Sequence, residues 1–308
     1  MQNLIWCKDI IMTARNKAYI YLILALTSWG SLYVASKYVL ETVPSYMLLF
    51  IRYFIALSIL IAVYRKYPKA VIEKRDYKYI FLIGFIGYFL AIGFQLLGTH
   101  YCNASMASLI TSMNPAMIIL LAVPILHEKI TLHKGFAIGI TLIGTVVIIG
   151  NLGSGNTVIG VVFSFISMAA WSLTSVVVRL SCQKYDSITV TIYSMLVGLT
   201  FALPAAMIEW KLTAFTIGEI SPSVVIWMIY IGIVCTAGGL LFWNKALELA
   251  DAATCSLFYP IQPLTSAILG VMFLNEVLSV NFIVGSALII GGILYAVVAD
   301  RKAEKNRK

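Results

Sequence analysis

The sequence predicts an all-α integral membrane protein whose ten transmembrane helices form two inverted five-helix repeats. Three observations predict it: the chain is mostly apolar, apolar runs of membrane-spanning length recur along it, and its two halves resemble each other. Of the 308 residues, 61% are hydrophobic and 11% are charged, and the mean hydropathy is +0.94. A soluble domain carries about 25% charged residues. These charges are too few to cover a globule of this size in water.

A transmembrane helix needs about 20 mostly apolar residues. Ten runs meet this requirement, at 18–36, 44–64, 79–98, 104–126, 132–150, 158–178, 188–208, 223–243, 252–274 and 280–299. The connections between them are too short for a soluble domain. The first run follows basic residues, as the apolar core of a signal peptide does. We expect it to be retained because it has a counterpart later in the chain.

The two halves align along most of their length. "WGSLYVASK" (29–37) matches "WSLTSVVVR" (171–179) at an offset of 142 residues. "NASMASLITSMNP" (103–115) matches "DAATCSLFYPIQP" (251–263) at an offset of 148. We therefore expect one five-helix repeat at 18–150, an external linker at 151–157 and a second repeat at 158–299.

The cationic residues predict the orientation. With the N-terminus in the cytoplasm, 19 of the 22 Lys and Arg residues fall on the cytoplasmic side, while Lys37 and Lys211 fall outside and Arg52 within a span. Such an excess is typical of cytoplasmic loops. Both the N-terminal segment 1–17 and the basic tail 300–308 are thus expected in the cytoplasm, the tail beside anionic lipid. The net charge of +9 then reflects topology, and we expect no nucleic-acid partner.

Five helices is an odd number, so the second repeat must enter the bilayer from the opposite face. Inverted repeats are a recurring plan of secondary transporters, which bind substrate near the midplane between the halves. A duplication that only builds a stable bundle is the alternative.

Three runs carry a family resemblance: "WGSLYVASK", "RYFIALSILIAV" and "NASMASLITSMNPAMIILLAVPILHEKIT". They resemble the EamA-type branch of the drug/metabolite transporter superfamily over about residues 18–299. The resemblance implies ten-helix inverted repeats, both termini inside, and export of amino acids, other metabolites or toxic compounds. Related branches carry nucleotide sugars or sugar phosphates. The second repeat departs from the first, with Trp171-Ser172 where the first has Trp29-Gly30 and no arginine to match Arg52.

Two prolines occupy matching positions in the fourth and ninth spans. Pro115 and Pro263 each lie near the centre of a span and follow an amide residue, Asn114 and Gln262. Proline removes a backbone donor, which at membrane depth is tolerated where protein or a watery cavity satisfies the freed carbonyl. The pattern predicts that Asn114 and Gln262 face one cavity and bind cargo, with the prolines as gating elements. A kink that only sets packing is the alternative.

Other polar or aromatic residues fall near the same depth and complete the candidate binding site. They come from the first, third, fourth, sixth and ninth spans: Trp29, Tyr88, Gln95, Ser108, Thr111, Trp171, Ser256 and Tyr259. Asn244 joins them from the eighth span. Trp243, at a span end, is expected to be an anchor in the membrane interface.

Arg52 is the ionisable residue placed deepest in a span. A charge there is costly and normally faces a bundle interior or a cavity. It either attracts a carboxylate of the substrate or contacts carbonyls at helix ends, possibilities that the sequence leaves open. Glu128 and Glu276 end the fourth and ninth spans, where each either caps the following helix or forms a gating ion pair.

The sequence shows no enzyme signature. His127-Glu128 is followed by His133 rather than by the spacing of a zinc helix, and the five cysteines lack metal spacing. We expect no cofactor, metal or catalytic residue. The predicted function is export of a small neutral or zwitterionic metabolite such as an amino acid, across the cell membrane, by a monomer or homodimer. A channel-like or drug-efflux permease and a membrane scaffold are the alternatives.

Overall fold

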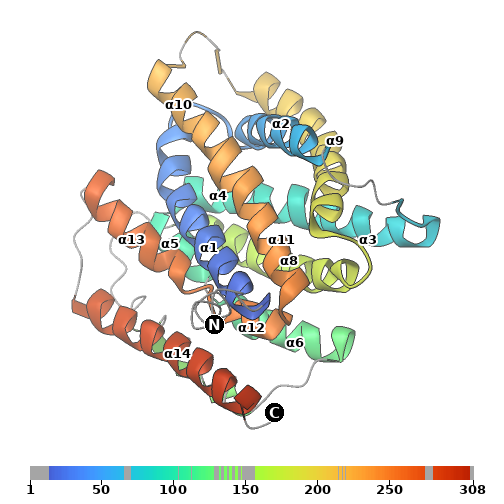
Figure 1. The fold of residues 1–308 in the computed structure, drawn as a ribbon. Helices are drawn as coiled ribbons and strands as arrows, with labels where there is room; N and C mark the ends of the chain where they lie inside the picture. Colours follow the sequence, from blue (N-terminus) through green and yellow to red (C-terminus); the bar gives the residue numbers. More distant parts are fainter. Residues whose placement is uncertain are drawn as a thin grey trace, which may run out of the picture.

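The computed structural model describes residues 14–65, 71–102, 104–111, 113–127, 157–213, 215–216, 218, 220–274 and 280–305, with isolated residues between 132 and 147. All regular elements in these ranges are helices, so the all-α prediction is confirmed (Figure 1).

The first half of the chain begins with α1 (Ala14–Val39) and α2 (Ser45–Tyr64). The third span is one long rod made of a 3-10 turn η1 (Lys74–Asp76), α3 (Tyr77–Leu82), the π-helix η2 (Ile83–Ala91) and α4 (Ile92–Tyr101). The fourth span consists of α5 (Ala104–Thr111) and α6 (Asn114–Leu126). The expected fifth span lies mostly outside the described residues.

The second half repeats this order. It contains α8 (Val158–Cys182), α9 (Ser187–Leu212), a rod of α10 (Pro222–Tyr230), the π-helix η4 (Ile231–Gly238) and α11 (Gly239–Leu249), then α12 (Ala252–Ser256), α13 (Ile261–Leu274) and α14 (Val280–Lys305). The two π-helices begin at positions that the sequence alignment matches, Ile83 and Ile231.

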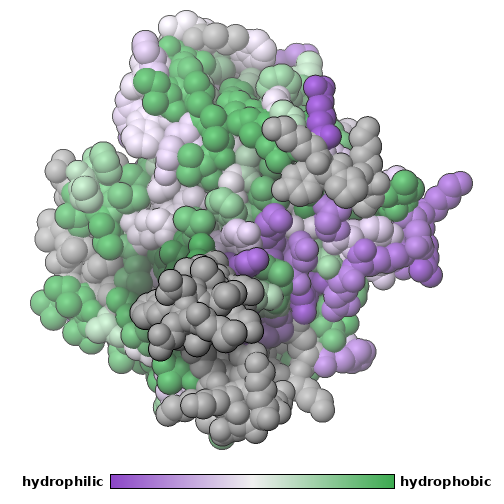
Figure 2. Space-filling model, viewed as in Figure 1, coloured by the Kyte–Doolittle hydropathy of each residue, from purple (hydrophilic) through white to green (hydrophobic). Residues whose placement is uncertain are grey.

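Seven helical stretches in the described part of the chain are long and apolar enough to cross a membrane, among them Ala14–Val39, Lys74–Tyr101 and Pro222–Leu249. Large apolar side chains such as Phe54, Ile208 and Ile226 are at least 60% exposed on the outside of the bundle. Figure 2 shows apolar surface over much of this face, with hydrophilic residues gathered around the segment that leads into α3. The chain is therefore a multi-pass membrane protein, and the count of ten spans stays a prediction.

The prolines lie at helix breaks. α5 ends at Thr111 and α6 begins at Asn114, so Pro115 occupies the first turn of α6. Likewise α12 ends at Ser256, a turn follows, and Pro263 is the third residue of α13. The first turn of a helix has no internal partner for its N–H groups, so proline removes no helical hydrogen bond there. Each proline thus follows a break in its span and does not kink a continuous helix.

Side chains from neighbouring helices bond the carbonyls of both π-helices. The indole Nε1 of Trp29 on α1 donates to the Cys235 carbonyl of η4 at 3.0 Å. The Tyr53 hydroxyl on α2 donates to the Tyr88 carbonyl of η2. A π-helix shifts the hydrogen-bond ladder from i−4 to i−5, which leaves carbonyls for such outside donors. These bonds fix α1 and α2 against the two rods that border the central cavity.

Two cations at the ends of α1 and α8 cap the two rods. Lys37 Nζ donates to the carbonyls of Thr99, His100 and Cys102 at 2.9–3.1 Å. Arg179 Nη1 donates to the carbonyls of Leu247 and Glu248 at 2.6 and 3.1 Å. The carbonyls of Thr99 and His100 match those of Leu247 and Glu248 in the alignment of the two halves, as Lys37 matches Arg179.

Candidate functional site

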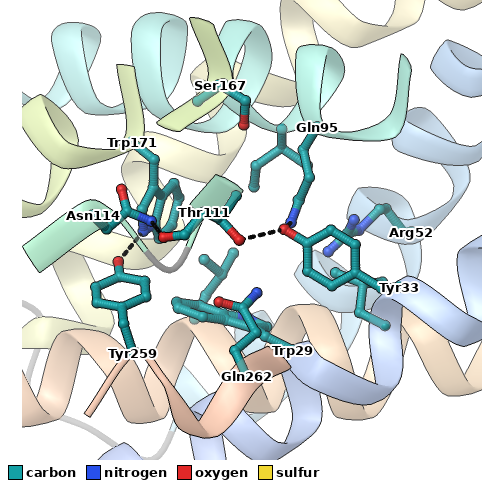
Figure 3. A pocket seen from close by; sticks show the side chains of 14 residues that line it. Trp29, Tyr33, Arg52, Gln95, Thr111, Asn114, Ser167, Trp171, Tyr259 and Gln262 are labelled. Carbon is teal, nitrogen blue, oxygen red and sulfur yellow. Dashed lines mark hydrogen bonds between the residues drawn. The ribbon is translucent and has the colours of Figure 1, made fainter. Parts of the chain in front are cut away.

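A cavity of about 30 Å³ lies between the two halves of the chain, with room for roughly two water molecules. Its lining comes from both halves: Trp29, Leu32, Tyr33, Arg52, Ala91, Ile92, Gln95, Thr111, Asn114, Ser167, Trp171, Leu240, Tyr259 and Gln262 (Figure 3). Eight of the eleven residues that the sequence predicted to bind substrate are among them.

A directed chain of hydrogen bonds crosses one wall of the cavity (Figure 3). Gln95 Nε2 donates to Tyr33 Oη at 2.7 Å, and Tyr33 Oη lies 3.0 Å from Thr111 Oγ1. Thr111 gives its single hydroxyl proton to the Ser108 carbonyl at 2.7 Å. The Tyr33 hydroxyl must therefore donate to Thr111, which leaves neither hydroxyl proton free for a ligand.

Aromatic rings from α1, α8, α11 and the turn before α13 pack together beside the cavity. The rings of Trp29 and Trp171 meet edge to face with their centroids 5.3 Å apart. Trp171 Nε1 donates to Tyr259 Oη at 2.6 Å. Trp243 is 1% exposed and packs against both Trp29 and Tyr259. The expectation that Trp243 anchors in the membrane interface is thus wrong, because α11 turns this ring into the protein interior.

Asn114 is held by bonds on both sides of its amide. Ser172 Oγ on α8 lies 2.7 Å from Asn114 Oδ1 and 2.8 Å from the Met168 carbonyl, and its one hydroxyl proton serves these two acceptors. Asn114 Nδ2 donates to the Thr111 carbonyl at the end of α5 at 2.5 Å. The side chain therefore bridges the helix break and ties it to α8.

Gln262 lines the same cavity with a buried acceptor. The side chain is 3% exposed, and its Oε1 has no hydrogen-bond partner among the described residues. A buried acceptor without a partner is unfavourable. A ligand that supplies an N–H or O–H donor would satisfy it.

Arg52 enters the cavity from α2. Its Nε donates to Thr236 Oγ1 of η4 at 2.7 Å, so the side chain contacts the eighth span. The residue is 1% exposed, and Nη1 has no partner within the described part of the chain. In Figure 3 the guanidinium points inward toward Tyr33.

Three of the predicted binding residues do not line the cavity. Tyr88 accepts a bond from Asn244 Nδ2 at 2.9 Å in a separate buried cluster with Thr191. Ser108 and Ser256 are fully buried inside their own helical segments. Glu128 and Glu276 fall outside the described residues, and Pro115 and Pro263 are buried next to lining residues.

Sequence reasoning missed the polar lining residues Tyr33 and Ser167. Tyr33 lies four residues after Trp29, and Ser167 lies four before Trp171. Residues four apart share a helix face. This spacing from the two tryptophans was the signal that would have found both.

Within the described ranges, no cluster of three or more His, Cys, Asp or Glu side chains could hold a metal ion. The cavity is instead lined by amide, hydroxyl, indole and guanidinium groups. Apolar helices thus surround a cavity with a few convergent polar groups, an arrangement typical of small-molecule sites.

Comparison with known proteins gives the family. The profile of the EamA-like transporter family matches residues 16–150 and again residues 158–298. The chain belongs to this family, within the drug/metabolite transporter superfamily.

Relatives match over nearly the whole length. One named "Uncharacterized transporter" from Archaeoglobus fulgidus is 30% identical, covering 92% of this chain and 100% of that protein. The uncharacterized transporter YetK of Bacillus subtilis is 24% identical over 96% of this chain and 91% of its own. A solved crystal structure shares the fold, with a TM-score of 0.76 at 20% identity over 94% of this chain and 99% of that one. Family and relatives indicate a transporter rather than an enzyme.

Proposed function

We propose that this protein is a secondary transporter that exports a small neutral or zwitterionic metabolite, such as an amino acid, by alternating access around the central cavity. The observation that carries the proposal is the cavity itself. It is buried at mid-span, receives side chains from both halves of the chain, and combines aromatic rings with amide groups and one guanidinium.

Two five-helix units, 18–150 and 158–299, are the moving parts in this proposal. The equivalent cation caps at Lys37 and Arg179 and the two matched π-helices support a common plan for both halves. Two nearly equivalent halves in opposite orientation can exchange roles, which opens the site first to one face and then to the other.

The size of the cavity supports a closed conformation. About 30 Å³ holds small ions or water molecules but not a metabolite of amino-acid size. Separation of the halves on either side would be needed to admit cargo. We assign both termini to the cytoplasm and the protein to the cell membrane, because the basic residues gather on one side of the predicted topology.

Counterflow in liposomes tests the mechanism. Vesicles loaded with unlabelled substrate should accumulate labelled substrate transiently above equilibrium. A carrier exchanges internal for external substrate faster than it carries out net transport. The cargo is identified by comparing the metabolites that cells release with and without the protein. Flux without exchange acceleration would indicate a channel, and no flux of any released metabolite would favour a scaffold.

A further inference from the structure

The guanidinium of Arg52 is a buried charge whose described surroundings are neutral. Its one protein hydrogen bond among the described residues runs from Nε to Thr236 Oγ1 at 2.7 Å. That hydroxyl in turn donates to the Ile231 carbonyl at 2.7 Å, within η4. The titratable groups that interact with Arg52 electrostatically are Tyr53, Cys235 and Tyr33, which are uncharged at pH 7.

No described carboxylate lies beside Arg52. At the molecular surface, Glu73 pairs with Arg75 and Lys184, and Asp76 pairs with Lys184. The carboxylate of Glu209 on α9 accepts hydrogen bonds from the backbone N–H groups of Ser45, Tyr46 and Met47 at 2.7–3.1 Å. The cavity therefore carries one positive charge from this part of the chain.

Arginine cannot escape this situation by losing its proton, because the guanidinium group stays protonated in proteins. A buried charge without a partner is strongly unfavourable and is normally paired. The nearby hydroxyl oxygens of Tyr33 and Thr111 are neutral, and each already accepts one bond, from Gln95 Nε2 and from Tyr33 Oη respectively. A negative group that enters the cavity would meet the free Nη1 donor at close range.

We propose that Arg52 binds one monovalent anionic group inside the cavity, supplied by a free halide or by a carboxylate of the cargo. The cavity's volume suits a single small anion in the closed conformation. Gln262 Oε1, which lies in the same cavity and has no partner among the described residues, then remains for a donor on the cargo. The proposal assigns charge to the cargo of the proposed transporter, but anion binding can be measured whether or not the protein transports.

The test uses the purified full-length protein in a buffer whose anion is a bulky sulfonate. Chloride, acetate and the neutral acetate analogue acetamide are titrated while the unfolding temperature is followed. A ligand that binds the native state raises this temperature in a saturable manner. We expect saturable stabilisation by chloride, acetate or both, and none by acetamide.

Variants connect the response to Arg52. Arg52→Gln should raise the apparent dissociation constant at least roughly tenfold, because the charge that attracts the anion is gone. Arg52→Lys keeps the charge and should retain a weakened response. It serves as the test if Arg52→Gln does not fold. Lys211→Gln removes an exposed positive charge and should respond as the unmodified protein does.

Each outcome has a defined meaning. Stabilisation by acetate that competes with chloride identifies one subsite for both sources, and a response to one of them identifies the source. A linear, unsaturable salt effect, or a full response in Arg52→Gln, overturns the proposal. Counterflow of a metabolite without any anion response would support the transport proposal and contradict the anion site. Anion binding without flux of any metabolite would support the anion site and contradict transport.

Discussion

Asn114 and Gln262 occupy matching positions in the two halves but differ in their hydrogen bonds. Asn114 Oδ1 accepts from Ser172 Oγ at 2.7 Å, whereas Gln262 Oε1 has no partner among the described residues. The residue that matches Ser172 in the first half is Gly30, and the Gly30 backbone packs directly on α13. A glycine cannot donate a side-chain bond. The two halves thus share a backbone plan, while one amide oxygen has a bond partner and the other has none among the described residues.

The close approach of α1 to α13 depends on Gly30. A Cβ atom there would lie 2.5 Å from Thr265 Cβ and 2.6 Å from the Gln262 carbonyl. Gly30→Ala should therefore push the two helices apart and cost about 1–3 kcal/mol of unfolding free energy, the usual range for overpacking. Thermal or denaturant unfolding in detergent measures the loss. Gly291→Ala, where a Cβ meets no atom, is the matched control and should not destabilise. Equal effects in both variants would contradict this packing.

Ser172→Ala removes the bond that distinguishes the first half from the second. The buried Asn114 Oδ1 would lose its partner, at a cost of about 1–3 kcal/mol. The double variant Ser172→Ala with Asn114→Leu should be less destabilised than the sum of the single variants, since the two side chains act as a pair. Additive losses in this cycle would show that the bond contributes nothing.

The third prediction compares Asn114→Leu with Gln262→Leu. Asn114→Leu should lower stability by roughly 1–2 kcal/mol because two hydrogen bonds disappear, while Gln262→Leu should be neutral or stabilising because it removes an acceptor without a partner. Cargo affinity should fall in both variants if both amides bind cargo. Binding and unfolding are measured on the same preparations. Full affinity and flux in both would place the binding site elsewhere.

The cation caps at Lys37 and Arg179 are a feature that the two halves share. Lys37→Met and Arg179→Met each remove bonds to carbonyls at the end of a rod, so both should destabilise by a similar amount, about 1 kcal/mol for a partly exposed cation. Unfolding measurements on the pair check this. A loss confined to one variant would show that the cap matters in one half alone.

The smallest effect is expected at the surface, where the halves differ in charge. Lys184 bonds to Glu73 and Asp76 between α3 and the α8–α9 connection, and these bonds lower the pKa of Glu73. A lowered pKa in the folded state adds stability above the ordinary carboxyl pKa, and this contribution is lost as pH falls through the folded value. Glu73→Gln should therefore flatten the acid limb of the stability curve slightly. Salt should weaken the same contribution.

The sequence predicted the helical class and the residues of the cavity more fully than the helix breaks. Apolar runs and periodicity follow from burial in lipid, which is a local property of the chain. The positions of Trp29, Trp171, Asn114 and Gln262 in the cavity could be expected from depth and internal similarity. The breaks before Asn114 and Ile261 could not, because a proline is compatible with either a kink or the first turn of a new helix.

By itself the sequence determined that the chain crosses a membrane several times, that its halves are related, and that one arginine lies within a span. Only the tertiary structure decided which polar atoms are satisfied. Trp243 turned inward, Tyr88 joined a separate cluster, and Tyr33 entered the cavity wall through its bonds to Gln95 and Thr111. Hydrogen bonds between side chains depend on how helices from distant segments cross. The difference between Ser172 and its counterpart Gly30 decides whether the amide at the matching position, Asn114 or Gln262, has a hydroxyl partner.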